Sequence, residues 1–138
     1  MAKPVIVTGS LRDIHSVGLR VLGYTLQKDF NIVATGAMVE QEDLINAAIE
    51  TNARAILVSS LYGHAELDCQ GFRQKCLEAG LGNILLYIGG NLVVGAERRS
   101  WEEVERAFKN MGFSRVYPPD VSPEQVLIDL KHDCGLAS

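Results

Sequence analysis

A histidine that follows a carboxylate by two residues stands near the start of this sequence. The segment Asp13-Ile14-His15-Ser16-Val17-Gly18 comes after a short β-branched run and before a stretch with helical spacing. One ring nitrogen of a loop histidine can bind a metal while a nearby carboxylate fixes the other nitrogen. A loop histidine alone is more often a surface residue than a ligand. The meaning of this pair therefore depends on the loops that surround it.

Strand and helix patterns alternate along the chain and predict which loops meet. Five strands separated by helices indicate one domain, residues 1–138, with a flavodoxin-like or Rossmann-like α/β fold. Its core would be a doubly wound, five-stranded parallel sheet, beyond whose carboxyl strand ends ligands bind. The loops after the first, third and fourth strands are the candidate site. Strands are expected at 5–8, 31–35, 55–60, 84–88 and 114–117, and helices at 17–28, 41–52, 66–79, 101–111 and 123–133.

Each of these three loops carries residues suited to holding a bulky ligand. The first contains the Asp13 and His15 pair, the second is Ser59-Ser60-Leu61, and the third begins with Gly89-Gly90. Serines that end a strand and paired glycines also have ordinary explanations in helix capping and turn geometry. All three loops nevertheless meet at one sheet edge, where glycines and a few polar groups among apolar walls would admit a large group.

Common nucleotide and phosphotransfer patterns are absent from the same loops. The first turn holds one glycine, Gly9, followed by Ser10 and Leu11, where a dinucleotide fingerprint needs three glycines. The sequence contains no Gly-Lys-Ser/Thr of a phosphate-binding loop. A phosphorylated receiver domain would need an aspartate where the third strand ends in Ser59-Ser60. The two nucleotide-binding motifs are therefore absent, and phosphotransfer to the end of the third strand is excluded.

Composition and charge restrict the partners and the compartment. The chain has 138 residues, of which 47% are apolar and 22% charged, with a net charge of −4. No dense basic stripe is present, which argues against nucleic acid as a partner. No apolar run is long enough for a membrane span, and no signal-peptide pattern opens the chain. Cys69, Cys76 and Cys134 contain no C-x-x-C pair, so we expect reduced thiols in a cytoplasmic protein.

Taken together, the three loops resemble the cobalamin-binding domain of adenosylcobalamin-dependent mutases. That family carries D-x-H-x-x-G, S-x-L and G-G, which appear here as Asp13-x-His15-x-x-Gly18, Ser59-x-Leu61 and Gly89-Gly90. Segments 45–51, 58–63, 89–95 and 111–118 are similar to the small (sigma) subunits of glutamate mutases, and the likeness covers nearly the whole chain. The sequence departs from the pattern in two places: Leu11-Arg12 replaces small residues, and Asp120 stands where glycine is common.

The resemblance implies adenosylcobalamin as the cofactor and a set of residues that hold it. His15 would be the lower axial ligand of cobalt, with Asp13 hydrogen-bonded to its other ring nitrogen. Gly18 would let the first helix pass close to the cofactor tail, which would lie in a slot beside the sheet. The implied contacts are Asp13, Ile14, His15, Ser16, Gly18, Ser59, Ser60, Leu61, Gly89, Gly90, Asn91, Leu92, Val93, Val94 and Gly95.

The resemblance also implies an activity and a partner. The activity is an isomerase, methylaspartate mutase, which rearranges the carbon skeleton of L-glutamate to threo-3-methylaspartate by a radical mechanism. This chain would supply axial ligation and no other catalytic residue, and it shows no arginine cluster for two carboxylates. A large catalytic (epsilon) subunit with a TIM barrel would bind the substrate, in a heterotetramer of two small and two large chains. The small subunit alone would be inactive.

Two other functions stay open at this point. A corrinoid carrier protein for methyl transfer shares the histidine motif, but it normally has a helical domain before it, whereas the first strand here is expected at residue 5. A non-enzymatic cobalamin-binding module would have the motif without a mutase partner. His64, at the same sheet edge, is expected to be a surface or neighbouring residue, because no aspartate stands at the orienting spacing. Arg12 receives no role.

Overall fold

A parallel sheet forms the centre of the computed structural model, which describes residues 3–11, 17–60, 68–90 and 100–136. Every strand pair is parallel, and the strand order is β2-β1-β3-β4-β5. The order changes direction between β1 and β3, which places a topological switch point at their carboxyl ends. The five-stranded parallel sheet is confirmed. Its strands are β1 (Val5–Ser10), β2 (Asn31–Ala34), β3 (Ala55–Ser59), β4 (Leu85–Gly89) and β5 (Arg115–Val116).

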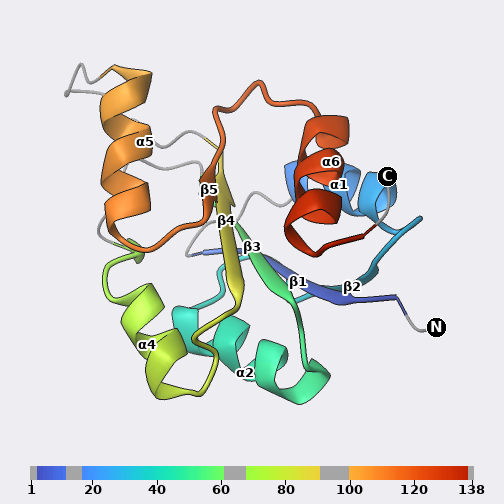
Figure 1. Ribbon diagram of the computed structural model, residues 1–138, viewed down its shortest axis with the longest axis horizontal. Coiled ribbons are helices and arrows are strands. Elements are labelled where there is room, and N and C mark those ends of the chain that lie inside the picture. Colours follow the sequence, from blue (N-terminus) through green and yellow to red (C-terminus); the bar gives the residue numbers. More distant parts are fainter. Residues whose placement is uncertain (1–2, 12–16, 61–67, 91–99, 137–138) are drawn as a thin grey trace.

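Helices cover both faces of this sheet (Figure 1). One face carries α1 (Val17–Leu26) and α6 (Pro123–Asp133), which lie side by side. The other carries α2 (Gln41–Thr51), α4 (Phe72–Glu78) and α5 (Trp101–Asn110). Successive side chains of a strand point to opposite faces, so β3 is buried on both. This double burial explains its uninterrupted apolar sequence.

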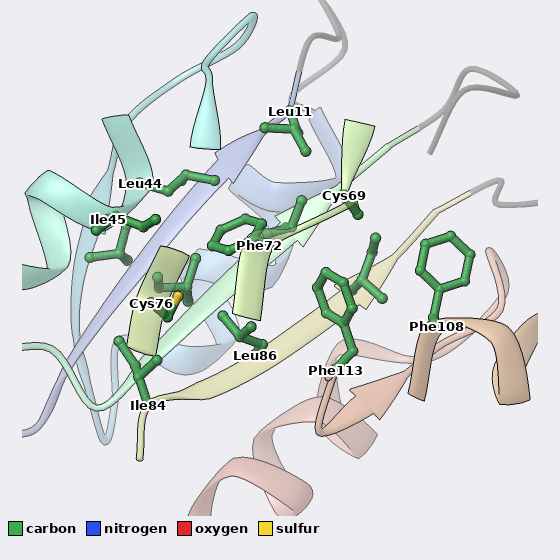
Figure 2. Packing of buried hydrophobic residues seen from close by; sticks show 14 of the residues in the cluster. Leu11, Leu44, Ile45, Cys69, Phe72, Cys76, Ile84, Leu86, Phe108 and Phe113 are labelled. Carbon is green, nitrogen blue, oxygen red and sulfur yellow. The ribbon is translucent and has the colours of Figure 1, made fainter. Parts of the chain in front are cut away.

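The larger core lies between the sheet and helices α2, α4 and α5 (Figure 2). The ring of Phe113 meets those of Phe72 and Phe108 edge to face, with centroids 6.1 and 6.0 Å apart. Close approach of α2 requires a glycine in β1. A Cβ atom on Gly9 would lie 2.7 Å from Leu44 Cδ2. Gly9 thus allows α2 to pack closely against β1.

One predicted helix is interrupted by a turn within the described residues. The sequence predicts a helix over 66–79, whereas α4 begins at Phe72. Gly71 just before it has a left-handed φ of 76°, which interrupts the helical path. The side-chain amide of Gln41 donates to the carbonyl oxygens of Asp68 and Gln70 at 2.6 and 3.1 Å. These bonds hold the turn before α4 against α2.

All three cysteines are buried, and none forms a disulfide in the structure. Burial raises the pKa of the Cys69 thiol to about 12, and the charge of Asp68 adds to this shift. Burial also raises the pKa of the Cys76 and Cys134 thiols. In the part of the chain that the structure describes, no helix is long and apolar enough to cross a membrane.

Candidate functional site

A cavity of about 310 Å³ opens at the carboxyl ends of β3 and β4, on the face that α1 and α6 cover. Its walls come from α1, from the last residues of β3 and β4, and from the segment that joins β5 to α6. This is the sheet edge at which ligands of open α/β folds bind. The lining residues are Leu19, Leu22, Leu57, Val58, Ser59, Tyr87, Ile88, Gly89, Gly90, Tyr117, Pro118, Pro119, Val121, Pro123 and Val126.

The structure brings together the second and third predicted loops at this cavity. Ser59, Gly89 and Gly90 line it, and the neighbouring Ser60 is buried. The amide of Ser60 donates to the carbonyl of Gly89 at 3.1 Å. Gly90 has a φ of 107°, and a Cβ atom on it would lie 2.3 Å from the Ser60 carbonyl oxygen. The glycine pair therefore lets the two loops touch at the cavity wall.

The chemical character of the lining favours a neutral organic group with flat apolar faces. None of the described residues that line the cavity is charged, and most are aliphatic or proline. Ser59 and the two tyrosines are the lining residues whose side chains carry a polar atom. The heterocyclic base of a nucleotide tail suits this lining, because the faces of its rings are apolar and its edge bears a few polar atoms. The described residues thus fit the tail of cobalamin.

Two tyrosines form the aromatic part of the lining. The rings of Tyr87 and Tyr117 pack edge to face with centroids 5.8 Å apart. Each hydroxyl donates to an aspartate of α6: Tyr87 to Asp133, and Tyr117 to Asp129, the latter at 2.6 Å. Burial first, and then these hydrogen bonds, raise the pKa of both phenols. Both tyrosines therefore stay protonated and fixed at neutral pH.

Arg115 of β5 joins the two aspartates. Its Nε and Nη2 atoms donate to the two carboxylate oxygens of Asp133 at 2.7 and 2.9 Å. Its Nη1 atom lies 3.5 Å from Asp129 Oδ1. The hydrogen bond from Arg115 is the main reason that the pKa of Asp133 lies below its ordinary value. The forked geometry ties β5 to α6.

The first predicted loop is not among the described residues. Gly18 lies in the first turn of α1. Leu19 and Leu22 of the same helix line the cavity. Within the described ranges, no group of three histidine, cysteine or acidic side chains could hold a metal ion. The predicted site residues outside those ranges are Asp13, Ile14, His15, Ser16, Leu61, Asn91, Leu92, Val93, Val94 and Gly95, together with Arg12 and His64.

The sequence-based prediction missed one wall of the cavity. It considered the loops after the first, third and fourth strands, whereas the segment after β5 supplies Tyr117, Pro118 and Pro119. The sequence contained a signal for this wall. Tyr117-Pro118-Pro119 directly follows a parallel strand, and it therefore lies at the same sheet edge as the other loops. The participation of α1 and α6 in the wall follows only from their packing.

A second, more open cavity of about 710 Å³ lies between α1 and the carboxyl end of β2. Leu19 lines both cavities, so α1 separates them. The second lining includes Arg20 and Gln27 and the backbone of Gly36. It is more polar than the first and holds none of the described serines or glycines of the second and third predicted loops.

Comparison with known proteins agrees with this geometry. The model of the B12 binding domain family matches residues 4–116. The chain is 53% identical over 138 residues to the glutamate mutase sigma subunit of Clostridium tetani, which covers 99% of each chain. A cobalamin-binding protein from Desulfitobacterium hafniense has the same fold, with a TM-score of 0.74 at 15% identity. The match covers 95% of this chain and 59% of that one.

The fold alone does not separate this family from others. A response regulator from Thermotoga maritima superposes with a TM-score of 0.70 at 9% identity, and the match covers 96% of this chain and 98% of the regulator. Identity over nearly the full length, rather than the shape of the sheet, therefore decides the relationship. The chain belongs to the B12 binding domain family and, within it, to the glutamate mutase sigma subunits.

Proposed function

We propose that this chain is the cobalamin-binding subunit of a glutamate mutase that uses adenosylcobalamin. The observation that carries the proposal is the 53% identity to a glutamate mutase sigma subunit along 99% of both chains. The apolar cavity beside Ser59 and Gly89-Gly90 supports it, because the motif residues of two loops border a space suited to a nucleotide base. The reaction is the reversible rearrangement of L-glutamate to threo-3-methylaspartate.

The proposal assigns cobalt ligation to His15 and its orientation to Asp13. A carboxylate that accepts a hydrogen bond from one ring nitrogen fixes the tautomer and raises the basicity of the other. Gly18 follows in the first turn of α1 and would let that helix pass close to the cofactor tail. Leu61 and residues 91–95 complete the proposed contacts next to Ser59 and Gly90.

The role of this chain is to bind and orient rather than to react with substrate. When bound, adenosylcobalamin supplies homolysis of its cobalt–carbon bond, which starts a radical rearrangement. The cavity residues would exclude water from the tail through their apolar side chains. Tyr87 and Tyr117 would form the aromatic part of the wall beside it.

A second subunit must provide the substrate site. None of the described residues that line the cavity is charged, so this cavity offers no partner for the two carboxylates of glutamate. A large catalytic subunit with a TIM barrel would bind the substrate at the upper face of the corrin. We propose a heterotetramer of two small and two large chains.

The ligand assignment is tested by electron paramagnetic resonance of the protein with cobalamin reduced to Co(II). The spectrum of the wild type should show splitting from one nitrogen of a protein imidazole when the histidine is labelled with ¹⁵N. His15→Ala should abolish this splitting, whereas His64→Ala serves as the matched control and should keep it. Loss of the splitting in His64→Ala alone would reassign the ligand, and no binding by the wild type would refute the cobalamin proposal.

The activity is tested with the partner present. The purified chain, a glutamate mutase large subunit, adenosylcobalamin and L-glutamate should together yield methylaspartate, and omission of either subunit should abolish the product. A requirement for a methyl acceptor instead of glutamate would favour a corrinoid carrier protein. Cobalamin binding without any activity in the mixture would favour a non-enzymatic module.

A further inference from the structure

We propose that Arg115, Asp129 and Asp133 are positioning residues for the cofactor tail: they hold Tyr87 and Tyr117 as a fixed aromatic wall of the cavity. The inference rests on the proposed function, because it takes the cavity as the site of a cobalamin tail. It concerns residues outside the three motif loops, and of these five side chains only the two tyrosines line the cavity.

The side chains that line the cavity are distinct from those that hold them in place. Among the described residues, Tyr87 and Tyr117 line the cavity, whereas Arg115, Asp129 and Asp133 do not. Each tyrosine directs its hydroxyl to one aspartate of α6. The aspartates therefore act on the cavity through the orientation of the two rings rather than by lining it themselves.

Charged hydrogen bonds and an ion pair make the cluster rigid. Arg115 binds both oxygens of Asp133 and also approaches Asp129, so one cation fixes two carboxylates at a distance of one helical turn. Gln125 adds a hydrogen bond of 3.0 Å to Asp129. Hydrogen bonds to charged groups are stronger than neutral ones, and a planar guanidinium restricts their direction. Each phenol thus has one defined orientation before any ligand arrives.

The cluster connects strands β4 and β5 to helix α6. Tyr87 belongs to β4 and Arg115 to β5, while both aspartates belong to α6. Val126 of the same helix lines the cavity. A substitution in this cluster therefore alters both the orientation of the tyrosine rings and the packing of α6 against the sheet. Preorganisation of this kind increases affinity by reducing the ordering needed on binding.

The test compares two corrinoids, cobalamin and cobinamide, of which the second lacks the nucleotide tail. Dissociation constants are measured by equilibrium dialysis for the wild type, Tyr87→Phe, Asp133→Asn and Lys131→Met, each well below its own melting temperature. Tyr87→Phe keeps the ring and removes only its anchor. Lys131→Met is the matched control, because Lys131 lies on the same helix and pairs with Asp29 at 3.7 Å, away from the cluster.

The expected result is a loss of cobalamin affinity of about tenfold in Asp133→Asn and a smaller loss in Tyr87→Phe. Cobinamide affinity should stay within about twofold of the wild type in every variant, since cobinamide has no tail to place. Lys131→Met should leave both affinities unchanged. If cobinamide binding is too weak to detect, the comparison of cobalamin affinity between Asp133→Asn and Lys131→Met decides.

Several outcomes would overturn the inference. They are equal losses for both corrinoids, unchanged cobalamin affinity in Asp133→Asn, or the same loss in Lys131→Met. A wild type that binds both corrinoids equally well would show that the cavity does not hold the tail. A wild type that binds neither would refute the proposed function instead, so the two failures are distinguishable.

Discussion

Gly90 lies so close to Ser60 that a Cβ atom on it would come within 2.3 Å of the Ser60 carbonyl oxygen. This contact joins the loop after β3 to the loop after β4 at the wall of the cavity. The φ of 107° at Gly90 is a second reason for glycine, because other L-residues rarely adopt it. Gly89 differs, since its Cβ atom would meet Tyr117 Cβ at an ordinary 3.6 Å.

The two glycines should therefore respond differently to alanine. Gly90→Ala should lower the free energy of unfolding by about 2 kcal/mol or more, from backbone strain together with the clash at Ser60. Gly89→Ala should change it by less than about 1 kcal/mol. Urea denaturation followed by circular dichroism measures both. Equal effects would contradict the close approach of Gly90 to Ser60.

Acid unfolding should depend on Asp133. The hydrogen bond from Arg115 lowers the pKa of Asp133 in the folded protein, so its stabilising contribution is present above the unfolded pKa of about 3.9 and is lost as the pH falls through the folded pKa. Asp133→Asn should be less stable than the wild type by about 1–2 kcal/mol at pH 7, since Arg115 remains partly exposed. This difference should shrink below about pH 4.

Denaturant midpoints between pH 2 and pH 7 measure this dependence. Glu105→Gln is the control, because Glu105 lies on α5, away from Asp133, and forms an exposed pair with Lys109 at 3.7 Å. This variant should follow the acid profile of the wild type. A stability difference between Asp133→Asn and the wild type that persists unchanged at pH 3 would refute the pairing with Arg115.

Alkaline pH should destabilise the protein through the two buried phenols. Burial and the hydrogen bonds to aspartates raise the pKa of Tyr87 and Tyr117, so their contribution is present below the unfolded pKa of about 10 and is lost above it. Absorbance at 295 nm should show that Tyr87 and Tyr117 ionise in the folded protein only above this value, and Tyr87→Phe and Tyr117→Phe identify their signals. Ionisation of Tyr87 and Tyr117 at pH 10 in the folded protein would contradict this expectation.

The three cysteines should be inert toward thiol reagents in the folded protein. Only the thiolate reacts, and burial keeps Cys69 protonated, with a pKa of about 12. Reaction with Ellman's reagent at pH 8 should be slow for the native chain and should reach three thiols after denaturation in guanidinium. Rapid modification of Cys69 without unfolding would show that the packing around α4 is open.

Much of the fold could be predicted from local patterns. Burial of β3 on both faces requires the continuous apolar run at residues 55–58, and alternation of strands with amphipathic helices leads to a parallel sheet. The site could be predicted in part for the same reason, because the ends of parallel strands meet at one edge. Ser59 and Gly89-Gly90 therefore come together as expected.

Local patterns could not predict what depends on contacts between distant elements. The start of α4 depends on the left-handed Gly71, which also breaks the run that the spacing suggests. The aromatic wall depends on the packing of α6 against β4 and β5, where Arg115 reaches Asp133 across 18 positions of sequence and Tyr87 reaches it across 46. No periodicity in a single segment encodes such a pairing.

The sequence by itself determined the order of the elements and the identity of the motif residues, because hydrophobic spacing and glycine positions act within each segment. Only the tertiary structure decided which side chains face the cavity and how they are held. It paired Gly90 with Ser60 and both tyrosines with α6, because burial and hydrogen bonding select partners in space.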